Sequence, residues 1–335
     1  MSYLYVYEHG GKLSISGNRI EVTVPNSSTI RSIPIEGVES ICLIGEVNIS
    51  SPSVAVFLKR NIQLLWLSPT GEFFGRLINT EKYNIARECR QFKLHEDDAF
   101  CLAMAKQWIH AKLKNQAVLL KRYQRQRGMD VTHWINEVEI AAAKVTGAAD
   151  LETVMGYEGS GARGYFQALS ALVHPDFTFH GRQRRPPTDP FNSMLSFGYT
   201  LLLYDLFTIL TSKGLNPYIG MMHALRNGHP ALCSDLMEEW RSLIVDSLVM
   251  HLVNKRSSTL EDFQPPAENG AVYMTKDASK RFIAAFEEKI RTTSNYLPYV
   301  DFPVSFRRAM ELQAGQLIKA IEKQDPSLYQ AVVLR

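Results

Sequence analysis

One histidine and two closely spaced carboxylates lie within a short stretch of this chain. His223 ends an apolar run that we expect to be helical, and Asp235 and Glu238 follow a polar turn on a second predicted helix. Residues three apart lie above one another on a helix, so the two carboxylates share a face. A short turn between antiparallel helices would bring His223 beside that face. One imidazole with two carboxylates suits a divalent metal that keeps positions open for water and phosphate. The competing interpretation is a buried core histidine and an acidic helix edge that faces solvent.

A third carboxylate, Glu158, lies in a glycine-rich segment, MGYEGSGARGYF, ahead of an apolar helical run. Small neighbours allow another helix, or a DNA backbone, to approach a carboxylate closely. The glycine spacing matches neither the dinucleotide-binding nor the P-loop pattern, which argues against nucleotide binding. Arg163 follows Glu158 by five residues and is a candidate phosphate contact. The alternative is a close-packed helix crossing in which Glu158 points to solvent.

Arginines stand between and beside the acidic segments. Arg182, Arg184 and Arg185 occupy a proline-rich loop, where a clamp on DNA phosphates is expected. The same loop would also suit a surface without a partner, or one that pairs with carboxylates of a second subunit. Arg226, in the polar turn, and Lys255 are further candidates for phosphate contacts.

A predicted long helix carries a second basic stretch. Residues 99–129 hold seven lysines and arginines, Lys112 among them, and no acid. This face either is simply solvated or follows nucleic-acid phosphates, with Trp108 and Tyr123 available for packing or stacking.

Length and composition describe an ordinary globular protein. The 335 residues are too many for one small core, and 45% hydrophobic and 21% charged residues are typical of soluble proteins. We find no run of eighteen apolar residues, no secretory leader and no C-x-x-C pair among the four cysteines. We therefore expect a protein of the reducing cytoplasm, without disulfides or structural zinc. The net charge of +3 does not by itself indicate a nucleic-acid binder.

The hydrophobic periodicity changes once along the chain. Through residue 78, short β-branched and aromatic runs alternate with turn residues, which predicts a strand-rich domain. Beyond it, apolar residues recur every three or four positions, which predicts helices. We therefore expect an α+β protein with a β-rich domain at 1–78, suited to association, and a larger α-helical domain at 79–335 that holds the candidate site.

Five features occur in order along the whole chain. They are the β-rich start and the segments MGYEGSGARGYF, RRPPTDPFNSMLSFGYTLL, GLNPYIGMMH and PALCSDLMEEWRSLIVD. Each is weak alone, but together they resemble the CRISPR-associated integrase of spacer acquisition. The resemblance implies a β-sandwich-like N-terminal domain joined to a larger all-α catalytic domain.

The resemblance also implies roles for the candidate residues. Glu158 and His223 match metal ligands of the family, and the third ligand falls within DLMEE, where Glu238 is the first choice. Asp235 would either hydrogen-bond to a metal ligand without touching the metal or bind a second metal. Which of Asp235 and Glu238 is the third direct ligand is open. The expected cofactor is Mg²⁺ or Mn²⁺.

The implied partners are DNA and protein. Members of the family look like homodimers, and two dimers clasp a dimer of a small ferredoxin-like CRISPR-associated protein. The double-stranded DNA consists of a captured fragment and a CRISPR repeat. The expected activity is that of a metal-dependent DNA endonuclease and integrase, which inserts foreign fragments as new spacers for antiviral defence.

The expected chemistry is attack of a 3′-hydroxyl of the captured fragment on a phosphodiester of the repeat. A metal ion stabilises charge on the phosphoryl and departing oxygens. No covalent enzyme intermediate is needed, because the hydroxyl itself is the nucleophile. Two alternatives are a general metal-dependent nuclease for DNA or RNA and a non-catalytic DNA-binding scaffold.

Overall fold

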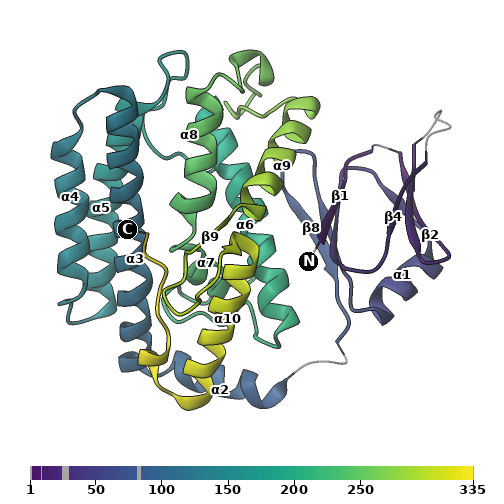
Figure 1. Cartoon of the computed structure of the whole chain (residues 1–335), viewed down its shortest axis with the longest axis horizontal. Helices are drawn as coiled ribbons and strands as arrows, with labels where there is room; N and C mark the ends of the chain where they lie inside the picture. The colour runs from purple at the N-terminus through teal and green to yellow at the C-terminus, as the bar shows by residue number, and fades with distance from the viewer. Residues whose placement is uncertain (1, 9, 25–29, 81–83, 335) are drawn as a thin grey trace. The chain divides into compact units, whose positions relative to one another are not determined.

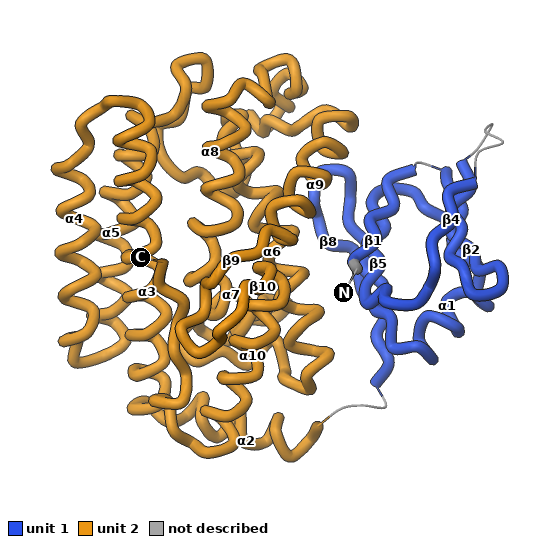
Figure 2. The backbone as a smooth tube through the Cα atoms, viewed as in Figure 1, with its two compact units in different colours: residues 1–83 blue, residues 84–335 orange. Residues whose placement is uncertain are grey.

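In a computed structural model the chain forms two compact units, Met1–Tyr83 and Asn84–Arg335, shown in Figure 2. The structure describes residues 2–8, 10–24, 30–80 and 84–334. The first unit is rich in strands and the second in helices, so the predicted α+β class is confirmed.

The first unit is built from two four-stranded sheets (Figure 1). In one sheet, with order β1-β5-β7-β8, the first three strands run parallel and β8 is antiparallel to β7. In the other, with order β4-β3-β2-β6, the first three strands form an antiparallel meander and β6 runs parallel to β2. The strands are Ser2–Val6, Lys12–Ser16, Arg19–Thr23, Ile30–Pro34, Val38–Ile44, Asn48–Ile49, Gln63–Leu67 and Phe73–Leu77, numbered β1 to β8.

One apolar core joins both sheets of this unit. Leu13 and Ile20 from one sheet pack in a single cluster with Ile41 and Leu64 from the other. Helix α1 (Ser51–Lys59) adds Phe57, which is fully buried. Strand β5 is buried almost throughout, as expected of a central strand covered on both faces.

The second unit consists mainly of helices. Their bounds are α2 Ile85–His95, α3 Asp98–Arg127, α4 Thr132–Val145, α5 Leu151–Leu172, α6 Pro190–Ser212, α7 Ala231–Met237, α8 Ser247–Asn254, α9 Lys276–Arg291 and α10 Phe306–Lys323. Short 3₁₀ turns lie at Leu260–Asp262 and Pro326–Leu328, and a two-stranded ribbon pairs β9 (Thr293–Ser294) with β10 (Val304–Ser305).

Helices α3, α4 and α5 lie side by side, as Figure 1 shows. Asp97 caps the start of α3 by accepting a hydrogen bond from the Phe100 N–H, and Gly128 ends the helix with a positive φ of 65°. Trp108 and Tyr123 on α3 are buried, at 0% and 4% exposure, so of the two expected uses packing is confirmed and stacking on nucleic acid is wrong. Their rings fill the core instead.

Glycines allow α5 to approach its neighbours. A Cβ atom at Gly161 would lie 2.4 Å from Leu113 Cδ2 and 3.2 Å from Ala141 Cβ, whereas one at Gly159 would meet nothing within 4 Å. The expectation that small residues permit close helix packing around Glu158 is therefore confirmed for Gly161.

Helix α6 is the apolar centre of the second unit. By length and composition it is long and apolar enough to cross a membrane, but 67% of its most apolar 18-residue stretch is buried inside the protein. Asp189 caps its first turn by accepting from the Asn192 N–H at 2.8 Å. Burial on most faces is what a core helix requires, and it explains the uniform apolarity of the sequence here.

The run from α7 to α8 departs from a regular α-helix at two places, a turn at residues 238–240 and the segment that follows it. Residues Ser242–Asp246 form a π-helical segment between the two α-helices. A π-turn accommodates one residue more than an α-turn and is often found at functional sites. This segment carries Asp246 into the interior of the unit, where it is 1% exposed.

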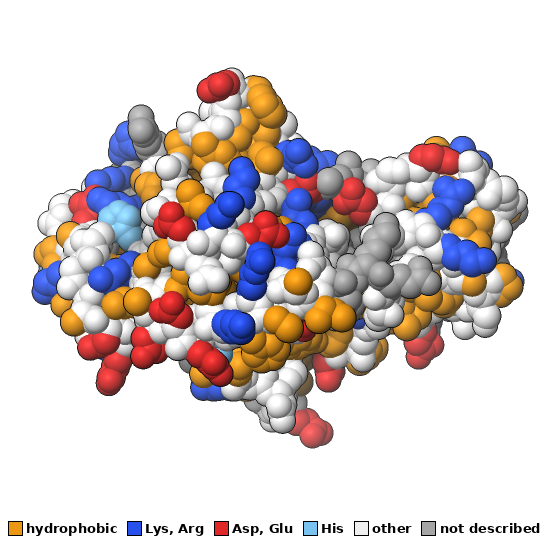
Figure 3. Space-filling model, turned by 90° about the horizontal axis from the view of Figure 1, so that it is seen from below, with side chains coloured by type: hydrophobic (Ala, Val, Ile, Leu, Met, Phe, Trp, Pro, Cys, Tyr) orange, Lys and Arg blue, Asp and Glu red, His pale blue; other side chains and the backbone are white. Residues whose placement is uncertain are grey.

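Charge is mixed rather than gathered on the face shown in Figure 3. Lys and Arg side chains are interspersed there with Asp and Glu. This agrees with the small net charge of +3.

We expect Gly161→Ala to lower the free energy of unfolding by about 1–3 kcal/mol, because the added methyl group overpacks the α3–α5 contact. Gly159→Ala on the same helix is the matched control. It should be neutral or stabilise by up to about 1 kcal/mol, because alanine favours a helix and the space there is open. Chemical denaturation of both variants measures the difference, and equal stabilities would contradict it.

Candidate functional site

Two of the predicted carboxylates meet at one buried lysine. Lys112, from the middle of α3, lies 2.7 Å from Glu238 Oε2 and also forms an ion pair with Glu158 Oε1. The side chains of Lys112 and Glu238 are 7% and 6% exposed, and that of Glu158 is 18% exposed. Three helices thus each deliver one charge to a single point, since Glu158 lies on α5 and Glu238 caps the end of α7.

Glu238 is strongly held in its ionised form. Burial alone would raise its pKa, but the positive charges of Arg241 and Lys112 outweigh burial and lower the pKa to about 2. Arg241 Nε donates to Glu238 Oε1 at 3.1 Å. His223 also lowers this pKa, as a nearby group that gains positive charge when protonated.

Asp235 organises the loop that carries His223. It is fully buried and accepts hydrogen bonds from the N–H groups of Met221, Met222 and His223 at 2.6, 3.1 and 2.9 Å. Its Oδ1 atom also lies 2.6 Å from His223 Nδ1. A carboxylate has no proton to give, so Nδ1 donates, and Nε2 is left as the nitrogen that could accept a proton or bind a metal.

The predicted helix around His223 is wrong. The residues from 213 to 230 form turns and bends without helix, and His223 lies on this loop. The predicted proximity to the carboxylate face is nevertheless found. Gly220 makes it possible, because a Cβ there would lie 2.7 Å from Asp235 Oδ2 and 2.8 Å from Ala231 Cβ.

A second histidine, His229, lies against His223. Their ring centroids are 6.0 Å apart in an edge-to-face arrangement, and His229 Nε2 lies 3.3 Å from the Ser234 hydroxyl. Burial lowers the pKa of His229, and the neighbouring His223 and the positive charges of Arg226 and Arg185 lower it further. Arg185 and Arg226 therefore contribute positive potential at the histidine end of the site.

A buried cluster of one carboxylate and two tyrosines packs against the guanidinium group of Arg241. Asp246 accepts hydrogen bonds from the Tyr165 and Tyr199 hydroxyls, the first at 2.6 Å. Burial raises the pKa of Asp246, an effect that these hydroxyls partly offset. The guanidinium groups of Arg241 and Arg182 lie over the Tyr199 ring, at 4.8 and 5.3 Å from its centroid.

Glu239, next to Glu238 in sequence, has a different role. It is fully buried and accepts hydrogen bonds from the Tyr329 hydroxyl at 2.6 Å and the Val332 N–H at 2.7 Å. Burial raises its pKa to about 7, although these donors work against the rise. Asn115 completes the attachment of the C-terminal segment, donating to the Val332 carbonyl at 2.8 Å and accepting from the Leu334 N–H at 2.9 Å.

The predicted arginine clamp is only partly available to a ligand. Arg182 is committed to the protein, since it donates to Asn192 Oδ1 at 2.9 Å and to Ser196 Oγ at 3.0 Å. Arg184 and Arg185 are exposed, as are Arg226 and Lys255. Of the three arginines on this loop, only Arg184 and Arg185 are therefore accessible to a phosphate.

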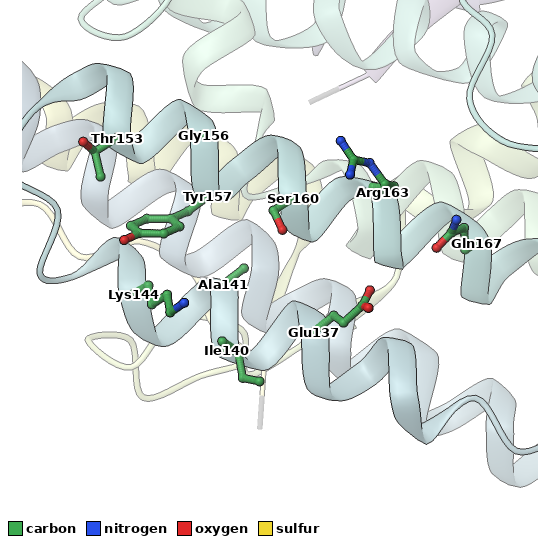
Figure 4. Close-up of a pocket in the computed structure, with 10 residues that line it drawn as sticks. All are labelled: Glu137, Ile140, Ala141, Lys144, Thr153, Gly156, Tyr157, Ser160, Arg163 and Gln167. Atoms are coloured by element: carbon green, nitrogen blue, oxygen red, sulfur yellow. The ribbon is translucent and has the colours of Figure 1, made fainter.

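Arg163 is also exposed but lies elsewhere. It lines a groove of about 610 Å³ between α4 and α5, drawn in Figure 4, together with Glu137, Lys144 and Tyr157. Residues five apart on a helix point about 140° apart, so Arg163 and Glu158 serve different faces of α5. The groove contains neither of the carboxylates that contact Lys112.

The donor types at the cluster suit a hard divalent cation. Carboxylate oxygens and one imidazole nitrogen are ligands of Mg²⁺ and Mn²⁺, and Glu158 and Glu238 already enclose a positive charge. Glu238 Oε2 is buried, and the Lys112 ammonium lies 2.7 Å from it. Among the described residues, however, no three His, Cys, Asp or Glu side chains are grouped closely enough to hold a metal ion. The residues fit a metal chemically, but Lys112 stands between two of them.

Sequence reasoning did not single out Lys112, Arg241 or His229. Lys112 was one of seven basic residues on a helix whose charged face was expected to be solvated or to follow phosphates, and it is buried instead. A signal was present, because Arg241 follows Glu238 by three residues and therefore shares its helix face. The contact of Lys112 with Glu158 spans 46 residues and had no local sign.

The fold matches that of solved structures. A chain of a casposase bound to its integration product aligns with a TM-score of 0.83 at 20% identity, covering 97% of this chain and 91% of that one. A chain of a Cas6-RT-Cas1–Cas2 complex aligns with a TM-score of 0.83 at 24% identity, covering 98% of this chain. This chain spans only 36% of that longer one. Similarity at these identities establishes the fold.

The family follows from sequence. The family described as CRISPR associated protein Cas1 matches residues 4–288. A CRISPR-associated endonuclease Cas1 from Mycobacterium tuberculosis is 32% identical over 327 residues, covering 98% of this chain and 96% of the relative. The chain belongs to the Cas1 family, the integrases of CRISPR spacer acquisition, and the resemblance seen in its motifs is confirmed.

We expect Asp235→Asn to lower the free energy of unfolding by about 2–4 kcal/mol, because one amide oxygen cannot replace a carboxylate that serves three N–H groups and an imidazole. Asp176→Asn is the matched control, since Asp176 also faces a histidine Nδ1, that of His174 at 3.3 Å, but is 60% exposed. It should change stability by less than about 0.5 kcal/mol. Urea denaturation compares the two, and equal losses would contradict the role given to Asp235.

Proposed function

We propose that this protein is a metal-dependent DNA endonuclease and integrase that inserts captured foreign DNA fragments as new spacers into a CRISPR array. The main support is the convergence of Glu158 and Glu238 on one cation, beside a histidine that Asp235 holds in place. The names of its relatives, an endonuclease and a casposase bound to an integration product, agree with this activity.

In this proposal Glu158, His223 and Glu238 hold the metal, Mg²⁺ or Mn²⁺. When bound, the ion supplies positive charge for the phosphoryl oxygen and the departing oxygen of a phosphodiester. Asp235 is assigned to orienting His223 rather than to direct ligation, because all its hydrogen bonds go to the His223 loop.

The protein groups have defined tasks in the transfer. Glu238 stays ionised at any pH well above 2, so it is ready to bind a cation without losing a proton first. His223 presents Nε2 because Nδ1 is engaged. The nucleophile is the 3′-hydroxyl of the captured fragment, so the protein needs no serine or cysteine nucleophile of its own.

DNA phosphates are proposed to bind at the exposed basic residues. Arg185 and Arg226 are the first candidates, because both act on His229 beside His223. Arg184 belongs to the same loop as Arg185, whereas Arg163 and Lys255 are candidates on other surfaces. Arg182 serves indirectly, by holding the loop to Asn192 and Ser196.

We further propose a homodimer that assembles with a small ferredoxin-like CRISPR-associated protein in the cytoplasm. Strand β8 is an edge strand with three exposed apolar side chains, Phe73, Phe74 and Leu77 at 41%, 64% and 39%. Exposed apolar edges of this kind are typical of surfaces that become covered by association. A Cas2-containing complex among the structural relatives agrees with such a partner.

We expect wild-type protein, supplied with the small partner and Mn²⁺ or Mg²⁺, to join a labelled short duplex to a plasmid that carries a repeat. Glu158→Ala and His223→Ala should each reduce joining by at least about 100-fold, because losing a metal ligand removes transition-state charge stabilisation. Gel analysis of joined, nicked and intact plasmid measures the result.

The controls separate the alternatives. Chelation of the metal should abolish joining while DNA binding persists. If wild type nicks or degrades the plasmid without joining, the general nuclease is the better description. Joining that survives both substitutions would show that the site lies elsewhere.

For DNA binding, we expect the double variant Arg185→Gln/Arg226→Gln to reduce the slope of log K against log salt by about 2, because two phosphate contacts are lost. Arg163→Gln is the comparison, and it should leave the slope unchanged, because Arg163 lines the separate α4–α5 groove. Fluorescence anisotropy with a labelled duplex at several salt concentrations measures both. The opposite pattern would place DNA on the groove.

A further inference from the structure

Lys112 occupies an unusual position for a lysine. It comes from a helix buried on most sides, and its ammonium group lies between the carboxylates of Glu158 and Glu238. Burial by itself would lower the pKa of Lys112, but the two carboxylates outweigh burial and raise the pKa instead. The lysine is therefore charged, and it forms ion pairs with these two glutamates.

The carboxylates need this charge. Two like charges that approach one point in a poorly solvated interior repel each other strongly. The Lys112 ammonium lies 2.7 Å from the buried Glu238 Oε2 atom and supplies its counter-charge. Arg241 neutralises the other oxygen of the same carboxylate. Lys112 links Glu158 to the cluster through their ion pair.

We propose that Lys112 is a tethered cation that stands in for the divalent metal: it holds Glu158 and Glu238 together while the site is empty, and an incoming ion must displace it. This rests on the proposed function, in which the same two glutamates are metal ligands. Lys112 is then a positioning residue that sets the metal affinity, because every ion bound must first break its two ion pairs. The displaced ammonium keeps its proton, so the exchange replaces one positive charge with two.

The direction of the effect follows from this exchange. Without Lys112 the glutamates lose a competing cation, so a metal binds without displacing anything and to a more negative site. A lysine that merely organised the ligands around a separate metal position would have the opposite effect, because its removal would scatter the carboxylates and weaken binding.

The test is Mn²⁺ affinity, measured by isothermal titration calorimetry and by the loss of the free-ion electron paramagnetic resonance signal. For Lys112→Met we expect the Mn²⁺ Kd to fall at least about tenfold relative to wild type. We also expect a lower melting temperature without metal and a larger rise on adding Mn²⁺, because removing one partner of a buried ion pair leaves the other charges uncompensated.

Lys121→Met is the matched control. Lys121 lies on the same helix and also pairs with a glutamate, Glu139 at 2.6 Å, but its side chain is 49% exposed. It stands nine residues beyond Lys112, about 13 Å along the helix axis. Its Mn²⁺ Kd should equal that of wild type.

A second measurement needs no variant, in case Lys112→Met does not fold. Amine-directed labelling of the wild-type protein, read by peptide mass spectrometry, should modify Lys112 slowly without metal and at least about threefold faster with Mn²⁺. Lys121 should be labelled at the same rate in both conditions.

The outcomes are distinguishable. Tighter Mn²⁺ binding by Lys112→Met, or metal-dependent exposure of Lys112, supports the proposal. Wild-type binding that Glu158→Ala abolishes, combined with equal or weaker binding by Lys112→Met and unchanged labelling, overturns it and leaves the proposed function intact. Binding of Mn²⁺ by neither wild type nor Lys112→Met overturns the metal site itself and, with it, the role of Lys112.

Discussion

The buried ion pairs of Lys112 with Glu158 and Glu238 are the constraint on which the second unit depends. Each charge comes from a different helix, and none of the three could be buried alone without a large desolvation cost. The helices must therefore pack closely enough for the charges to meet. Gly161 contributes to this, because α5 approaches α3 at a position where a methyl group would collide with Leu113. The ion pairs can therefore form only if the helices pack closely.

Much of the fold was readable from periodicity, and part of the site from spacing. The change from strands to helices and the shared face of Asp235 and Glu238 both follow from local patterns. The predictions that failed concern features set by contacts between residues far apart in the sequence. The loop around His223 looks helical in sequence because its residues are apolar, but its structure is set by Asp235, which binds three of its N–H groups from the next helix. Lys112 looks like any lysine of a basic helix until the fold brings Glu158 and Glu238 to it.

Three acidic residues of one helical run show how far environment decides chemistry. Glu238, Glu239 and Asp246 are all buried, yet their pKa values move apart. Paired with Arg241 and Lys112, Glu238 is driven to about 2, whereas Glu239, which has only neutral donors, rises to about 7. Asp246 rises as well, with tyrosine hydroxyls as its donors. Neighbouring glutamates in the sequence thus have separate tasks, one beside the cation and one fastening the C-terminal segment.

The π-helical turn at Ser242–Asp246 makes the length of this run as important as its residues. Before the turn, Glu238 faces Lys112 and Arg241, and at the end of the turn Asp246 faces the hydroxyls of Tyr165 and Tyr199. The extra residue of the wider turn reconciles the two orientations. If the same residues were forced into a regular α-helix without the wider turn, everything beyond the segment would rotate by about 100° relative to the part before it. Asp246 would then turn away from the tyrosine hydroxyls while Glu238 and Arg241 stayed in place, so the two ends of the run depend on the wider turn between them.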